Sequence, residues 1–167
     1  MAEIDKVKSE RNGLLVSVLG SLVVGCAGVA FWLLTGAEAI MLDGVFNLTY
    51  FITGLFAMKV ARLMLQGENN DFPVGYAYFE PLINGGKGVL MFAVTLVALI
   101  SAVVALFNGG RPIALGYAVI YGVFATVVCW VVALLIRGFA RRSGSPLVQA
   151  DASNWIVNAA ISSAVLV

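Results

Sequence analysis

Residues 14–34, LLVSVLGSLVVGCAGVAFWLL, decide the fold class because they contain no charged residue over the length of a membrane span. A helix of about 20 residues is about 30 Å long, which is the thickness of the hydrocarbon layer of a bilayer. The whole chain of 167 residues has the same character, with 61% hydrophobic residues, 11% charged residues and a mean hydropathy of +0.99. Soluble domains carry about 25% charged residues. We therefore expect an all-α protein, a polytopic bundle of transmembrane helices.

Four further apolar stretches follow the first, and turn-forming or charged residues separate them. After an N-terminal arm at 1–13, the predicted transmembrane domain covers 14–167, with spans at about 14–35, 39–66, 81–107, 113–136 and 147–167. The clearest loop is GENNDFP at 67–73, and residues 137–146 are interpreted as a polar hinge. The fifth stretch has no polar flank after it, so we expect the chain to be a piece of a longer protein.

The basic residues predict the orientation of the bundle. Of the ten Lys and Arg residues, Lys87 lies inside the third span and Arg111 alone lies on one side of the membrane. Loops rich in Lys and Arg remain in the cytoplasm. We therefore expect a cell inner (plasma) membrane protein with a cytoplasmic N-terminus, because the other basic residues share one side: Lys6, Lys8, Arg11, Lys59, Arg62, Arg137, Arg141 and Arg142.

The composition also excludes several function classes. The chain has no histidine, and its two cysteines, Cys26 and Cys129, lie in apolar runs that predict small core residues. The 9 acidic and 10 basic residues nearly balance, so no net charge favours a nucleic-acid partner. No Ser/His/Asp set, phosphate-binding loop, CxxC or HExxH motif occurs. We expect neither an enzyme nor a bound cofactor.

Polar residues inside two of the predicted spans point to a cation site. Asp43 and Asn47 are four residues apart, which places both on one face of a helix, and Asp151, Asn154 and Asn158 form a similar stripe. An ionised Asp inside a membrane helix costs about 2.5–3.5 kcal/mol, so such residues usually face a bundle interior or a water-filled cavity. If these two stripes face each other in the bundle, their side-chain oxygens would surround one cation. The alternative is hydrogen bonding that only joins helices, worth about 0.6 kcal/mol per pair.

Other polar residues in the spans have simpler interpretations. Lys87 either snorkels to the cytoplasmic surface or pairs with a carboxylate. Glu80 lies at the mouth of the third span, where a carboxylate suits the positive end of a helix dipole. Both remain candidates for a role in coupling. Ser17, Ser21 and Gly25 repeat every four residues in the first span, which favours close helix packing.

Three motifs resemble the transmembrane part of the cation diffusion facilitators, also called the cation efflux family. The first is AIMLDGVFN at 39–47, with its acidic residue and amide four apart. The second is PVGYAYFE at 73–80, which leads into the third span and is similar to the family's Pro-x-Gly-(His/Tyr)-x-(Arg/Lys)-x-Glu pattern. The third is Ala150-Asp151, followed by Asn154 and Asn158.

The resemblance implies a fold of six transmembrane helices, a homodimer and a cytoplasmic C-terminal metal-binding domain. We expect the sixth helix and that domain to be absent from this chain. Members typically export a divalent metal in exchange for protons by alternating access. Carried over residue by residue, the metal site comprises Asp43, Asn47, Asn154 and Asn158, with Asp151 as a second carboxylate.

This ligand set departs from that of zinc transporters in the family, which usually place His or Asp where Asn154 and Asn158 stand. One carboxylate and three amides, without imidazole or thiolate, suit a cation harder than zinc, such as Mn²⁺ or Mg²⁺. Asp43 is then the group that exchanges protons. Two alternatives stay open: a monovalent or organic cation/proton antiporter on the same scaffold, and a membrane scaffold that transports nothing. In each case membrane lipid surrounds the protein.

Overall fold

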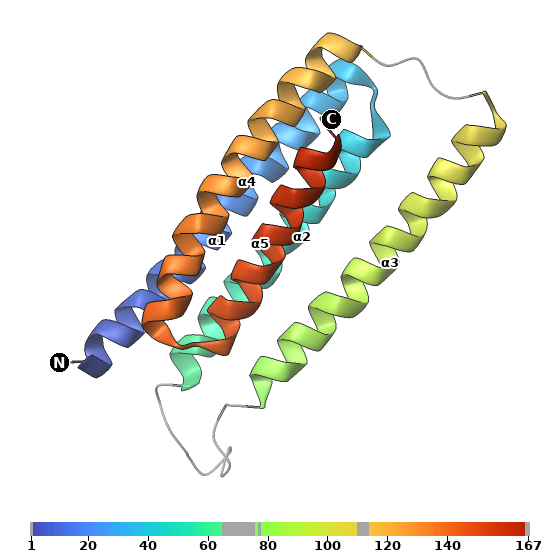
Figure 1. Cartoon of the computed structure of the whole chain (residues 1–167). Helices are drawn as coiled ribbons and strands as arrows, with labels where there is room; N and C mark the ends of the chain where they lie inside the picture. The colour runs from blue at the N-terminus through green and yellow to red at the C-terminus, as the bar shows by residue number, and fades with distance from the viewer. Residues whose placement is uncertain (1, 65–75, 77, 110–113, 166–167) are drawn as a thin grey trace.

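The computed structural model describes residues 2–64, 76, 78–109 and 114–165 (Figure 1). Its regular structure is α-helical, as predicted. The helices, in chain order, are α1 (Ala2–Thr35), α2 (Glu38–Met64), α3 (Phe79–Phe107), α4 (Leu115–Ser143) and α5 (Pro146–Val165).

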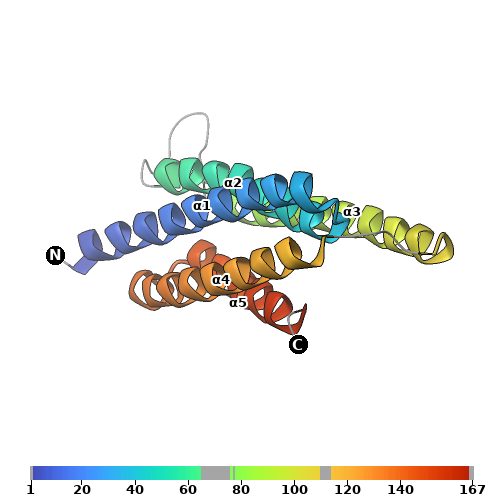
Figure 2. The ribbon, with the colours of Figure 1, turned by 90° about the horizontal axis from the view of Figure 1, so that it is seen from above.

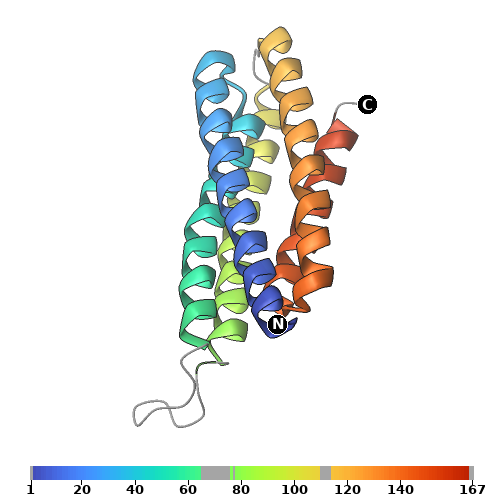
Figure 3. The same ribbon diagram turned by 90° about the vertical axis from the view of Figure 1, so that its left-hand side faces the viewer.

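The helices run side by side along one axis (Figure 3). α1 packs against α2 on one side and α4 on the other, and α5 packs mainly on α4. Figure 2 shows α1 and α2 in one row and α4 and α5 in a second. α3 packs against α2, where Ser101 donates a hydrogen bond of 2.7 Å to Glu38.

Small residues let α1 and α2 approach each other closely. A Cβ added to Gly28 would lie 2.6 Å from the Cα of Gly44, and one added to Gly25 would lie 2.9 Å from the Leu48 side chain. On the same stripe Ser17 accepts a buried hydrogen bond of 3.0 Å from the indole of Trp155. Gly25 and Ser17 of the predicted small-residue stripe therefore pack against two other helices, and the closest contact between α1 and α2 is made by Gly28, which was not part of that prediction, against Gly44 next to Asp43.

Four of the helices are long and apolar enough to cross a membrane: Ile4–Thr35, Glu38–Leu63, Pro81–Phe107 and Leu115–Ser143. The chain is therefore a multi-pass membrane protein. α5 is helical as predicted, but its described residues do not meet the same criterion, since they include Gln149, Asp151, Asn154 and Asn158. Its insertion as a fifth span stays a prediction.

Two predicted boundaries differ from the structure. α1 begins at Ala2, so the N-terminal arm continues the first span as one helix. α4 runs through Ser143, and Gly144, with φ 68°, ends it by donating its N–H to the Ala140 carbonyl at 3.0 Å. The hinge predicted at 137–146 is too long, because Arg141 and Arg142 in a last turn favour a helix end rather than a loop. The predicted loop at 67–73 lies outside the described residues.

The two cysteines differ in their surroundings. Cys129 is fully buried, as predicted, whereas Cys26 is exposed, so the expectation of a core position for Cys26 is wrong. Lipid tails are as apolar as a protein core, so an apolar run does not show which of its faces points inward.

Candidate cation site

The α2 half of the predicted site is assembled in the structure. The Asn47 amide nitrogen donates to the Asp43 carbonyl oxygen at 2.8 Å and to the carboxylate Oδ1 at 3.1 Å. Asn47 is fully buried, and its Oδ1 has no hydrogen-bond partner in the described part of the chain. A buried carbonyl oxygen normally accepts at least one hydrogen bond. Next to the carboxylate, this oxygen is free to bind a cation.

Tyr121 of α4 is a residue that the sequence reasoning missed. Its hydroxyl donates a hydrogen bond of 2.5 Å to Oδ2 of Asp43. Gly28 leaves room for this contact, because a Cβ there would lie 3.0 Å from the Tyr121 oxygen, and the Phe31 ring packs 5.5 Å from the tyrosine ring. A buried Tyr hydroxyl normally has a hydrogen-bond partner. That rule could have pointed to Tyr121, since it lies in a span without charged residues.

In the α5 half of the predicted site, Asn158 contacts Cys129 of α4. The Asn158 amide nitrogen lies 3.8 Å from the Cys129 sulfur, and Asn154 is half-buried on the same helix. Across the described residues, no hydrogen bond joins Asp43 or Asn47 directly to Asn154 or Asn158. In this conformation the two halves are connected through α4.

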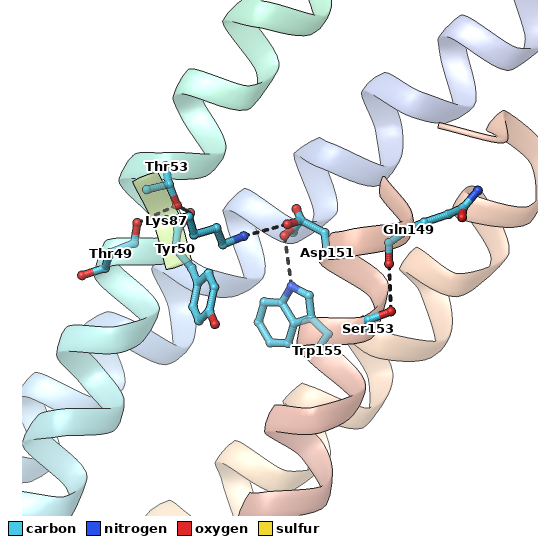
Figure 4. A network of polar contacts seen from close by, with 9 residues as sticks. Thr49, Tyr50, Thr53, Lys87, Gln149, Asp151, Ser153 and Trp155 are labelled. Carbon is cyan, nitrogen blue, oxygen red and sulfur yellow. Dashed lines mark hydrogen bonds and ion pairs between the residues drawn. The ribbon is translucent and has the colours of Figure 1, made fainter. Parts of the chain in front are cut away.

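Asp151, the second candidate carboxylate, is held in an ion pair. Lys87 of α3 donates from Nζ to Asp151 Oδ1 at 2.9 Å, and the two side chains are only 12% and 11% exposed. The ammonium also lies 4.5 Å from the centre of the Tyr50 ring on α2 (Figure 4). Of the two interpretations of Lys87, pairing with a carboxylate is the one observed. Glu80 lies in the first turn of α3, and its side chain is outside the described set.

The donor chemistry of the site is unusual for a metal centre. Within the described ranges, no group of three or more His, Cys, Asp or Glu side chains is close enough to hold a metal ion. Any cation here would depend on amide and hydroxyl oxygens around the single carboxylate of Asp43. Such oxygen ligands are typical of Mg²⁺, Ca²⁺ and Mn²⁺.

Residues 14–167 match the model of the cation efflux transmembrane domain. The chain belongs to the cation efflux family. Members of the cation efflux family are membrane transporters rather than enzymes; their substrates are cations, and lipid surrounds their helices. The chain is also 19% identical over 140 residues to the manganese efflux system protein MneP of Bacillus subtilis (strain 168). That match covers 84% of this chain and 46% of MneP, so the chain spans about half the length of the curated relative.

Proposed function

We propose that this cation efflux chain exports a divalent cation harder than zinc, such as Mn²⁺ or Mg²⁺, from the cytoplasm in exchange for protons. The observation that carries the proposal is the fully buried Asn47 Oδ1, which lacks a donor among the described residues and lies beside the Asp43 carboxylate. A cation would supply the missing positive partner for both oxygens. A buried carbonyl oxygen normally accepts a hydrogen bond, and Asn47 Oδ1 differs from the other buried oxygens without a partner in the described part of the chain, Ser21 Oγ and Thr126 Oγ1, in lying beside a carboxylate.

The proposed ligands are Asp43 and Asn47, which lie together on α2, and Asn154 and Asn158 on α5. Movement of α5 toward α2 would bring the two asparagines of α5 to the same cation as the α2 pair, which is the kind of change that alternating access requires. Carboxylate and amide oxygens suit Mn²⁺, and the set lacks the imidazole and thiolate ligands that suit Zn²⁺. The name of the relative MneP, a manganese efflux protein, supports the same choice.

Asp43 is the only carboxylate among these four residues, so it is the group that would carry a proton back. Tyr121 and Asn47 donate hydrogen bonds to its two oxygens. A cation entering the site would displace these donors, and a proton would take its place when the cation leaves. Tyr121 is thus a positioning residue that holds the free carboxylate in place.

The basic residues support a cytoplasmic N-terminus. Lys6 and Lys8 lie near the start of α1, and Arg62, Arg141 and Arg142 lie in the last turns of α2 and α4. These three helix ends lie at the same end of the bundle (Figure 1). By the positive-inside rule this end faces the cytoplasm. We also propose a homodimer in the inner membrane, as the family resemblance implies.

The test is cation-driven proton flux in proteoliposomes that contain the full chain and a pH-sensitive dye. We expect flux with Mn²⁺ or Mg²⁺ and little with Zn²⁺, Na⁺ or K⁺. Asp43→Asn keeps the shape of the side chain and should abolish the flux. The control is Thr95→Ala, an exposed α3 position whose hydroxyl donates to the Met91 carbonyl of its own helix. Normal transport by Asp43→Asn would show that the site is elsewhere, and a clear preference for Zn²⁺ would contradict the ligand argument.

Flux with Na⁺ or K⁺ alone would favour the monovalent antiporter, and no flux with any cation would favour the scaffold.

A further inference from the structure

Besides the four proposed ligands, three helices bring a cation, a carboxylate and an aromatic ring together at Lys87, Asp151 and Tyr50. Figure 4 shows the Lys87 side chain of α3 reaching toward Asp151 of α5 beside the Tyr50 ring of α2. The ammonium lies 2.9 Å from the carboxylate oxygen and 4.5 Å from the ring centre. α3 packs mainly against α2, so this ion pair also ties α3 to α5.

The cluster lies between the candidate site and the basic end of the bundle. Tyr50 follows Asn47 by three residues toward the end of α2 at Met64, and Asp151 precedes Asn154 by three residues toward the start of α5 at Pro146. Three residues rise about 4.5 Å along a helix. The C-terminal end of α2 and the N-terminal end of α5 both lie at the end of the bundle that carries the basic residues (Figure 1). A cation travelling from that end to Asn47 or Asn154 would pass this cluster first.

The surroundings of the Lys87 ammonium are those of a bound cation. A carboxylate and the face of an aromatic ring are both groups that attract positive charge, especially where little water is present. Both side chains of the ion pair are nearly buried. Without Lys87, the Asp151 carboxylate would be a buried, unpaired charge, which is strongly unfavourable until another cation binds.

We propose that Asp151 and Tyr50 form a second cation-binding position, an entry site for the transported ion, and that Lys87 fills this position as a tethered competitor. The proposal rests on the proposed function in that it takes the bound ion to be the exported one. When a cation binds at Asp151, the long Lys87 side chain moves its ammonium toward the water at the end of the bundle that carries the basic residues.

A tethered competitor would set both the affinity and the selectivity of the entry site for cations. A group on a short flexible link competes at an effective concentration of the order of millimolar. A monovalent ion gains no charge interaction by replacing the ammonium, whereas a divalent ion doubles the attraction to Asp151. Lys87 is therefore a specificity-determining residue that favours divalent cations and makes the entry site weak.

The test is equilibrium binding of Mn²⁺ to the purified full chain in nanodiscs, measured by titration calorimetry. We expect two phases in the unmodified protein, a strong one at Asp43 and a weak one at Asp151. Lys87→Met should strengthen the weak phase at least about tenfold and make it sensitive to Na⁺ and K⁺, because the competitor is gone. Lys87→Arg should behave like the unmodified protein. Lys59→Met removes an exposed lysine near the same end of the bundle and should change nothing.

Two further variants keep the proposal testable if Lys87→Met does not fold. Asp151→Asn should lose the weak phase and keep the strong one. The double variant Lys87→Met with Asp151→Asn removes both charges, leaves no unpaired buried charge, and should also lack the weak phase. The proposal is overturned if Lys87→Met binds Mn²⁺ like the unmodified protein, or if the weak phase persists in Asp151→Asn. Failure of the proposed function has a different signature, since Asp43→Asn would then leave the strong phase intact.

Discussion

Gly28→Ala tests whether the close contact of α1 and α2 holds the candidate site in shape. The new Cβ would lie 2.6 Å from the Cα and 2.8 Å from the nitrogen of Gly44, and 3.0 Å from the Tyr121 hydroxyl. Carbon atoms in contact are normally about 3.5–4.0 Å apart, so the two backbones must separate by about 1 Å. Overpacking of this kind costs about 1–3 kcal/mol. A shift of about 1 Å next to a reacting group lowers activity by up to about 100-fold.

The matched control is Gly138→Ala in α4, where an added Cβ would meet no atom of the described residues within 4 Å. Both substitutions raise helix propensity by a similar amount, up to about 1 kcal/mol, so the clash accounts for the difference between them. We expect Gly28→Ala to have a lower free energy of unfolding than Gly138→Ala by about 1–3 kcal/mol. For a chain of this size each kcal/mol corresponds to roughly 2–4 °C in melting temperature.

The assay is thermal unfolding of both variants in detergent, followed by Mn²⁺-driven proton flux in vesicles. Gly28→Ala should lose most of the flux because its Cβ displaces the Tyr121 hydroxyl from Asp43. Equal melting temperatures and equal flux in the two variants would refute the reasoning, because the α1–α2 contact would then not support the site.

Two other substitutions separate packing from ion selection. Cys129→Ser replaces a soft sulfur beside Asn158 with a harder oxygen, so Mn²⁺ flux should persist while inhibition by Zn²⁺ or Cd²⁺ weakens; unchanged inhibition by these ions would show that the thiol lies outside the cation path. Trp155→Phe removes the indole donor to Ser17 but keeps an aromatic ring, so thermal unfolding should show a loss of about 0.6–1.7 kcal/mol with little change in flux per folded molecule; a selective loss of flux would give this contact a role in transport.

Much of the fold could be predicted from the sequence, because hydrogen bonding inside lipid requires continuous helices. The uncharged stretch at 14–34 and the later spans therefore predict helices by their length and apolar character alone. The ends of the helices were less predictable. Arg137 to Arg142 form a charged run that indicates a hinge on hydropathy alone, yet α4 continues to Ser143 because a helix can leave the apolar layer without ending.

Contacts within one helix could be predicted, and contacts between helices could not. The pairing of Asp43 with Asn47 follows from a spacing of four residues alone. The bonds from Tyr121 to Asp43 and from Lys87 to Asp151 join residues 78 and 64 positions apart. They depend on which face of each helix points inward.

In a soluble protein, the contrast between apolar and polar faces would indicate that orientation. In a membrane the outward faces of the helices are also apolar, so the apolar residues of α3 and α4 do not show which face points inward. The polar residues show it instead, because each buried donor or charge needs a partner that lipid cannot supply. Asp151 needs a cation, and Lys87 on α3 supplies one. If the entry-site proposal holds, the same requirement would make Asp151 a binding position for the transported ion when the lysine moves away, so the contact between α3 and α5 would also control entry to Asp43.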